Sequence, residues 1–372
     1  MISDGQMTVG ALAGALEDRF PSAMAEPWDR VGLIVGDPAT EVAGVLVTLD
    51  ATTEAVNRAV ASGANVLVTH HPPFLEAPVR FVPAPGSAGT VAAALRQGCA
   101  VISLHTNLDR ADEGASALAL ALGLNVLEPL ESGTEPVTLL TAMVPPEFEG
   151  AVRAAMEAAG AGRMGEYAGC AFVSDGVGHF TARAGAAPDR PAGSAGTPES
   201  RIEMVCAPST VERVLEAARA AHPYEEPSIL GIDGRRVRAS ARLGRICTWS
   251  PDSTLGDLAR HVSETLGVAA RVWGDPERPV LRVAVANGSA GSLLARAASV
   301  SDVIVAGEVR YHDALDAVAS GLAIIEAGHD ATEWPLVAVL GRAVAEIAPN
   351  VNVRCERPAI DWWTVEASDD RR

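Results

Sequence analysis

The chain has 372 residues, 48% hydrophobic and 20% charged, a composition typical of globular proteins. This length favours two or three domains. The formal net charge of −18 argues against general nucleic-acid binding or a membrane-surface role, because such a surface repels phosphate backbones and anionic lipids.

The first third of the chain alternates predicted helices and strands. Helices are expected at residues 9–20, 52–61, 89–98 and 114–122, and apolar strands at 44–49, 65–69 and 100–104. Strands that are almost wholly apolar and alternate with helices predict a mainly parallel sheet covered on both faces.

The middle of the chain has a different rhythm. It predicts strands at 137–144 and 201–206, helices at 147–159 and 210–221, and a hairpin formed by 170–174 and 179–184. Residues 185–200 are rich in Ala, Gly, Pro and Ser, which predicts a loop. This order of elements favours a ferredoxin-like α+β domain inserted at 136–242.

The last third returns to the α/β pattern. Strands are expected at 281–286, 302–305 and 323–325, helices at 293–298, 312–319 and 335–347, and an edge strand at 351–354. The predicted organisation is therefore α/β, with segments 1–135 and 243–372 forming one domain around the insert.

The cysteines and the N-terminus point to the cytoplasm. The five cysteines are an odd number and lie far apart, which argues against a disulfide framework and a thiolate zinc site. Residues 1–20 contain Asp4 and lack a basic segment followed by an apolar one, so a secretory signal is not expected. No run of 18 apolar residues is present, so no membrane span is expected.

All 29 basic residues are arginine. A Walker-type phosphate loop and a Schiff-base lysine are therefore both excluded, since each needs lysine. The abundance of Ala, Gly and Arg points to a general composition bias as the reason.

The second predicted strand runs into His70 and His71, which Pro72 and Pro73 follow. Proline stops the strand and forces the preceding residue toward extended geometry, so both imidazoles can converge at the strand end. The alternative is a pair of surface histidines in a turn.

Two further strand ends carry histidine and carboxylate. The third strand is followed by His105 and Asp109, where open α/β sheets place ligands. Asp109 could equally cap a helix. A late strand is followed by His329 and Glu333, one helical turn apart. Here the alternative is a capping box between Asp330 and Glu333.

Taken together, these strand ends predict a metal centre. Four of the eight histidines lie there, and imidazole with carboxylate suits Zn, Mn, Fe or Ni. Five ligands are too many for one four-coordinate zinc with an open position, but suit two metals bridged by a carboxylate.

Several segments together resemble the dinuclear-metal family known as GTP cyclohydrolase 1 type 2, or Nif-three-like proteins, in its long form. The matching segments are WDRVGL from Trp28, THHPPF from Thr69, HTNLD from His105, HPYEEP from His222, GSAGS from Gly288, GEVRYH from Gly307 and GHDATE from Gly328. The resemblance departs at Arg30, where asparagine is expected, and at 287–292, which is less glycine-rich than usual.

The resemblance implies two divalent metal ions held by five ligands, with Glu333 as the bridge and His105 close by. The predicted ligands are His70, His71, Asp109, His329 and Glu333. It implies a PII-like or CutA-like insert and a ring-shaped homohexamer. It also implies a hydrolase whose metal-bridged hydroxide attacks a nucleotide-like substrate, converting GTP to a ring-opened formamide product. Glu308 and His312 are the candidates for general acid–base work, alongside His105. A capping Glu308 and a merely exposed His312 are equally compatible with the sequence.

Two other functions fit the same residues. One is a regulatory or chaperone-like protein whose metals are structural or sensory. The other is a nucleotide phosphodiesterase or phosphatase with the same centre and a different pocket. An open metal position facing a polar pocket would favour either enzyme over the regulatory protein.

Overall fold

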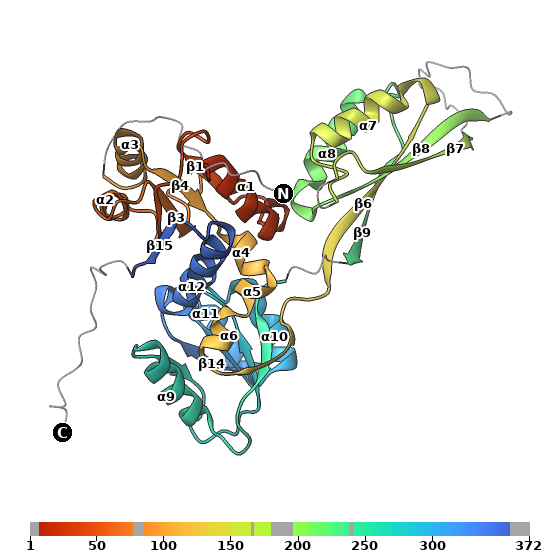
Figure 1. The fold of residues 1–372 in the computed structure, drawn as a ribbon. Coiled ribbons are helices and arrows are strands. Elements are labelled where there is room, and N and C mark those ends of the chain that lie inside the picture. Colours follow the sequence, from red (N-terminus) through yellow and green to blue (C-terminus); the bar gives the residue numbers. More distant parts are fainter. Residues whose placement is uncertain (1–6, 77–84, 165–166, 180–195, 238–241, 358–372) are drawn as a thin grey trace. The chain divides into compact units, whose positions relative to one another are not determined.

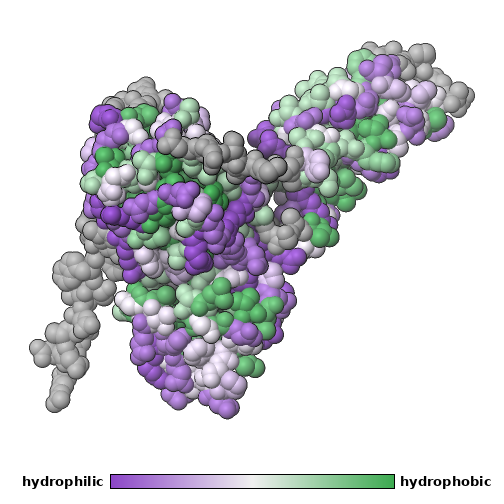
Figure 2. Space-filling view, viewed as in Figure 1, coloured by the Kyte–Doolittle hydropathy of each residue, from purple (hydrophilic) through white to green (hydrophobic). Residues whose placement is uncertain are grey.

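The computed structural model describes residues 7–76, 85–164, 167–179, 196–237 and 242–357. The chain divides into two compact units. The first unit combines Met1–Glu131 with Ala241–Arg372, and the second is Ser132–Ser240. Figure 2 shows hydrophilic and hydrophobic residues interspersed over the visible face. Among the described residues, no helix is long and apolar enough to cross a membrane.

The first unit contains a five-stranded sheet in the order β1-β4-β3-β2-β15. The strands are β1 (Gly32–Val35), β2 (Gly44–Asp50), β3 (Val66–His71), β4 (Ala100–Ser103) and β15 (Asn352–Cys355). β15, β2, β3 and β4 run parallel, and β1 pairs antiparallel with β4. β1 was not predicted, because it starts at Gly32, which weakens a strand pattern, and only its last residue is buried.

Both faces of this sheet are covered by helices. In β2, Val45 and Val47 pack on one face and Leu46 on the other, as strand alternation requires. The first face packs against α1 (Val9–Arg19) and α12 (His329–Ile347), and the second against α2 (Thr53–Ala61) and α3 (Ser87–Gln97). Figure 1 shows α12 lying close to this sheet.

A second sheet of the same unit has six strands in the order β11-β14-β13-β12-β10-β5. They are β5 (Asn125–Pro129), β10 (Arg245–Thr248), β11 (Arg271–Trp273), β12 (Arg282–Val285), β13 (Val303–Ala306) and β14 (Ala323–Glu326). Only β12, β13 and β14 are parallel to one another. The three strands β5, β10 and β11 were not predicted, and all pair antiparallel at or near the two edges.

Helices also cover the second sheet. α6 (Ala117–Ala121) and α9 (Leu255–Leu266) pack on one face, and α10 (Leu294–Val300) and α11 (Tyr311–Ala319) on the other. The helix expected at 114–122 divides into α5 (Asp112–Ala115) and α6, preceded by α4 (Thr106–Arg110). α9 was not predicted, although Thr254 and Asp257 form a capping box and Gly267 ends the helix.

The second unit is a four-stranded antiparallel sheet in the order β7-β8-β6-β9. Along the chain the order is β6 (Thr134–Val144), α7 (Glu149–Ala158), β7 (Ala171–Gly178), β8 (Thr197–Cys206), α8 (Val211–Ala221) and β9 (Ile229–Val237). Leu140 and Met204 pack with α7 and α8 on one face.

Two predictions for this unit need correction. β7 pairs with β8, while residues 180–184 of the expected hairpin lie outside the described residues. Residues 197–200, expected to be loop, belong to β8, and 185–195 are not described. Composition alone misplaced this boundary, since the strand continues from its apolar part into Thr197, Pro198 and Glu199.

Replacing Leu340 with alanine should destabilise the first unit. Its side chain is fully buried on α12 against the five-stranded sheet, so the change leaves a cavity. Such substitutions cost about 2–5 kcal/mol of unfolding free energy. Urea unfolding followed by circular dichroism should give a lower midpoint, whereas Leu120→Ala, on the exposed side of α6, should change it little. Equal midpoints for the two variants would contradict this packing.

Candidate metal centre

The predicted ligands gather where parallel strands of both sheets end. His70 and His71 are the last residues of β3, and His105 follows β4. His329 opens α12 directly after β14. Because α12 starts at the second sheet and packs on the first, its first turn lies beside the end of β3. Side chains from three segments that are far apart in the sequence are therefore brought together within one unit.

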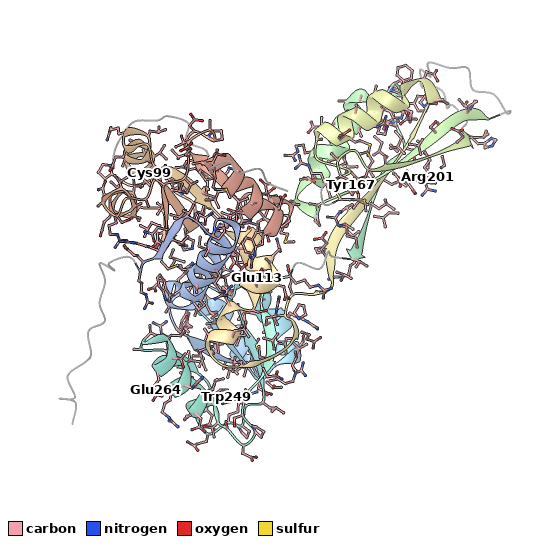
Figure 3. The ribbon with its side chains drawn as sticks, in the orientation of Figure 1. Cys99, Glu113, Tyr167, Arg201, Trp249 and Glu264 are labelled. Atoms are coloured by element: carbon pink, nitrogen blue, oxygen red, sulfur yellow. The ribbon has the colours of Figure 1, made fainter. Side chains whose placement is uncertain are left out.

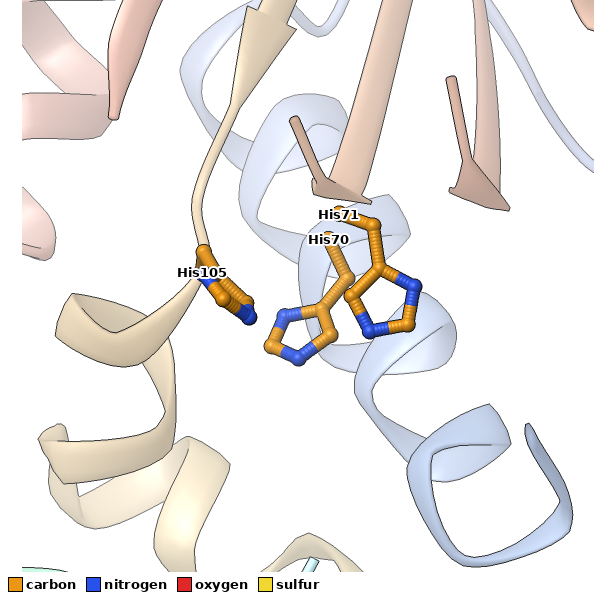
Figure 4. Close-up of side chains that lie close together, drawn as sticks. All are labelled: His70, His71 and His105. Carbon is orange, nitrogen blue, oxygen red and sulfur yellow. The ribbon is translucent and has the colours of Figure 1, made fainter. Parts of the chain in front are cut away.

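The histidine rings are in mutual contact. The ring centroids of His70 and His71 are 4.9 Å apart, and His105 lies 5.1 Å from His70 and 5.5 Å from His71. Figure 4 shows these three rings turned toward one another. The ring centroid of His329 lies 5.5 Å from that of His71. His70 is fully buried, so the alternative of two surface histidines in a turn is wrong for this residue.

Each of these four rings has its Nδ1 atom held by an oxygen. A ring whose Nδ1 donates to an oxygen carries its free lone pair on Nε2, which is the usual arrangement of metal-binding histidines. The four contacts are His70 with Leu104 O at 2.9 Å, His71 with Asp50 Oδ1 at 2.8 Å, His105 with Asp29 Oδ1 at 2.8 Å and His329 with Glu308 Oε1 at 2.9 Å.

Glu333 is the carboxylate around which three of the rings are arranged. Its Oε1 lies 3.0 Å from His329 Nε2, and its Oε2 lies 3.0 Å from His71 Nε2. His70 Nε2 is 3.8 Å from Oε1 and 3.6 Å from Asp109 Oδ2. Glu333 does not form the alternative capping box, because α12 begins after Gly328 with no side-chain cap. Asp109 lies within α4 and caps nothing at its start.

The donor set fits a cation. His70 Nε2 and Glu333 Oε2 are buried, and neither has a partner with hydrogen-bond geometry among the described residues. Burying such atoms without a partner is costly, and a cation placed between them would remove that cost. Two groups could hold a metal ion, each with ligand atoms within 4.8 Å of one another. They are His70, His71 and His105, and His71, His329 and Glu333.

The electrostatics of the centre also call for positive charge. Burial acts to lower the pKa of His71, but the carboxylates of Asp50 and Glu333 on either side of the ring outweigh burial and raise the pKa to about 10. The hydrogen bond to Glu333 raises the pKa of His329 to about 9. Burial acts to raise the pKa of Glu333, but the histidine rings that lie against its oxygens hold it far below its usual range. Protons or metal ions must therefore balance these carboxylates.

Two glycines allow the chain to pass close to the ligands. A Cβ atom on Gly288 would lie 2.2 Å from Glu333 Oε1, and one on Gly307 would lie 2.7 Å from the His329 Cα. Gly288 also has a φ of +56°, which disfavours other residues. Its N–H donates to Thr332 Oγ1, and the Ala290 N–H donates to Glu308 O. The GSAGS segment therefore packs against the centre and uses these two N–H groups internally.

The catalytic candidates occupy different positions. His105 belongs to one of the two groups that could bind metal. Glu308 is half exposed and its carboxylate holds His329, so it orients that ring. His312 is exposed, and its ring contacts Tyr311, 5.4 Å away. No role was predicted for Asp29 or Asp50, because a contact that orients a ring from another strand or loop leaves no local pattern.

Removing a ligand should lower the metal content. In His71→Ala and in Glu333→Ala, the cation would lose a donor in the group that these residues share with His329. Mass spectrometry of protein purified without chelator should find less metal per chain than in the parent. His312→Ala is the matched control, because this exposed ring lies outside both groups, and it should keep its metal. Unchanged metal in both ligand variants would contradict the assignment.

The metal-free chain should lose stability as the pH rises. The pKa values of about 10 for His71 and about 9 for His329 exceed the ordinary value of 6.5. Their stabilising contribution is complete below pH 6.5 and is lost as the pH rises through 9–10. Thermal unfolding of chelator-treated protein from pH 6 to 10 should show this fall, and metal-loaded protein a smaller one. Parallel curves for the two forms would contradict it.

Comparisons with known proteins identify the family of this chain. The family model described as Duf34/NIF3 (NGG1p interacting factor 3) matches residues 7–360. The chain is 37% identical over 334 residues to the GTP cyclohydrolase 1 type 2 homolog of Mycobacterium bovis, covering 86% of each. It is 35% identical over 322 residues to the homolog of Bacillus subtilis, covering 84% of this chain and 86% of that protein.

A solved structure matches over almost the same length. The crystal structure of a Bacillus cereus protein related to NIF3 superposes with a TM-score of 0.64 at 30% identity, covering 97% of this chain and all of that one. A Staphylococcus aureus protein superposes with a TM-score of 0.65 at 25% identity, covering 97% and 99%. The resemblance expected from the motifs is thereby confirmed, and the chain belongs to the Duf34/NIF3 family.

Proposed function

We propose that this chain is a metal-dependent hydrolase acting on a small, nucleotide-like substrate. Its centre would hold two divalent ions, of Zn, Fe, Mn or Ni, on His70, His71, Asp109, His329 and Glu333. The observation that carries the proposal is the position of Glu333, whose two oxygens each face the Nε2 atom of a different histidine. A carboxylate whose two oxygens face different histidines is suited to bridging two ions.

The chain's own residues would prepare the reaction by fixing the ligands. Asp50, Asp29 and Glu308 each hold a ring through Nδ1, so that the Nε2 atoms need no reorientation when cations bind. Ions bound here would polarise a substrate oxygen and make bound water acidic enough to ionise near neutral pH. Buried His70 and half-exposed His329 define an inner and an outer side, and substrate would approach from the outer one.

The candidates for general acid–base catalysis include two exposed groups. Glu308 has a half-exposed carboxylate at the edge of the centre. His312 lies in the first turn of α11, four residues later, and its ring is exposed. These two residues, with His105, are the proposed proton-transferring groups.

GTP is the first substrate to test. The Mycobacterium bovis and Bacillus subtilis relatives are named GTP cyclohydrolase 1 type 2 homologs. The proposed reaction on GTP is hydrolytic opening of the guanine ring to a formamide product. Attack at phosphorus, as in a nucleotide phosphodiesterase or phosphatase, would use the same ligands.

The second unit completes the proposal. We propose that residues 136–242 form an inserted ferredoxin-like domain of the PII or CutA kind, between segments 1–135 and 243–372. The observed βαββαβ order and the sheet order β7-β8-β6-β9 support this. We further propose a cytoplasmic homohexamer, as the family resemblance implies.

A regulatory metal protein is the second candidate. Its support is the burial of His70 and Glu333, since structural metal sites are closed by protein ligands. The metals would then stabilise the first unit, and the second unit would bind an effector or partner.

Metal analysis followed by a nucleotide screen distinguishes these functions. Protein purified without chelator should contain close to two metals per chain and, when supplemented with Zn, Fe, Mn or Ni, should convert GTP to a ring-opened product. Phosphate release without ring opening would indicate phosphatase activity, and conversion of a nucleotide diester to a monoester would indicate phosphodiesterase activity. Two metals without turnover of any nucleotide would favour the regulatory function, and absence of metal would contradict both.

His312→Ala should lower the hydrolytic rate while leaving the metal content unchanged, because the ring is exposed outside both metal-capable groups. General acid–base groups typically contribute about 10²–10⁴-fold. Measuring kcat together with metal content separates the two effects. The control His261→Ala removes a ring that hydrogen-bonds Leu122 O, away from the centre. Loss of metal in His312→Ala would make His312 a ligand, and an unchanged rate would remove it from catalysis.

A further inference from the structure

The side chain of Trp28 is exposed close to the centre and has no role in the hydrolase proposed above. Trp28 is 51% exposed and precedes β1 in the loop after the short helix Ser22–Met24. Indole is a large, mainly apolar group that proteins usually cover in most part. Its exposure therefore indicates that a bound molecule covers the indole.

The loop that carries Trp28 is held firmly. Asp29 is buried, and its carboxylate accepts hydrogen bonds from His105 Nδ1 and from the Thr106 N–H. The Glu26 N–H donates to Thr106 Oγ1 at 2.9 Å. These contacts tie both sides of Trp28 to the start of α4. The exposure of the indole is thus a feature of a fixed loop.

Arg30 fixes the same loop from its other end. Its guanidinium donates to the backbone oxygens of Trp28, at 3.2 Å, and Asp29, at 2.7 Å. This is the residue that departs from the asparagine expected in the motif. Here the longer side chain folds back on the backbone, which further limits the positions that Trp28 can adopt.

The indole lies one ring away from the proposed metal ligands. Its centroid is 6.0 Å from that of His105, with the ring planes at 71°, so the two rings meet edge to face. His105 is in turn 5.1 Å from His70 and 5.5 Å from His71. An edge-to-face contact at one side leaves much of the indole surface open, as its exposed fraction requires.

We propose that Trp28 is the wall against which the substrate's planar ring stacks. The substrate would be a heteroaromatic compound of nucleobase size, with one edge directed at the histidines and one face on the indole. Stacking suits this task because every base has a π face, and a fixed indole loses little freedom when it binds. The inference rests on the proposed function in placing the substrate at the metal centre.

Equilibrium binding tests this inference without turnover. GTP carries a planar base, and inorganic tripolyphosphate carries a similar charge without a ring. Isothermal titration of metal-loaded, full-length protein with both compounds would compare the parent with Trp28→Ala and Trp28→Phe. Tyr167→Ala is the matched control, because Tyr167 is an exposed aromatic residue of the second unit (Figure 3). Metal content and light scattering accompany each variant.

The expected result is selective. Trp28→Ala should bind GTP about 5- to 150-fold more weakly, since a stacked base is worth about 1–3 kcal/mol, while its tripolyphosphate binding stays unchanged. Trp28→Phe should retain most of the affinity, and Tyr167→Ala all of it. Because binding alone is measured, a protein that binds GTP through Trp28 without hydrolysing it would support this inference and count against the hydrolase.

Several results would overturn the inference. If the parent bound GTP no more tightly than tripolyphosphate, the base would contribute nothing to binding. Equal losses for both compounds in Trp28→Ala would show that Trp28 supports the centre and not a ring. A changed molecular mass with unchanged GTP affinity would place Trp28 at an interface between copies of the chain.

Discussion

The arrangement of this chain depends on one buried carboxylate. Glu333 is almost completely enclosed, and the groups nearest its oxygens are imidazole nitrogens whose opposite sides are already bonded. A neutral imidazole held in this way presents a lone pair to the carboxylate, which is repulsive. Only added positive charge, as protons or as metal ions, makes the arrangement favourable. The raised pKa values of His71 and His329 reflect the same need for positive charge next to Glu333.

The fold brings the ligand side chains close enough together to share cations. Parallel strands in two sheets end near the same place, and α12 starts at one sheet and packs on the other. The loops after β12 and β13 must also pass close to the ligands. Gly288 and Gly307 allow this, because a side chain at either position would collide with the ligands or their backbone. The oxygens that hold each Nδ1 come from other strands and loops, so the first unit must be complete before the rings are fixed.

Much of this could be predicted from the sequence, and what could not has a physical reason. Long apolar strands and the residues that follow them leave local patterns, so β2, β3 and β4 and the positions of His70 and His329 were predictable. The short antiparallel strands β1, β10 and β11 leave no such pattern. Asp29 and Asp50 act through contacts across 76 and 21 residues, which spacing does not reveal. The ambiguous Glu333 was resolved only by seeing α12 begin without a side-chain cap.

The most direct test of the central claim is anomalous X-ray diffraction from crystals of protein purified without chelator and supplemented with zinc, measured on both sides of the zinc edge. We expect two anomalous peaks next to Glu333, one within bonding distance of its Oε1 and one of its Oε2, with the Nε2 atoms of the histidines as further ligands. The absence of any peak beside Glu333, with the same rings still held through Nδ1, would contradict the account.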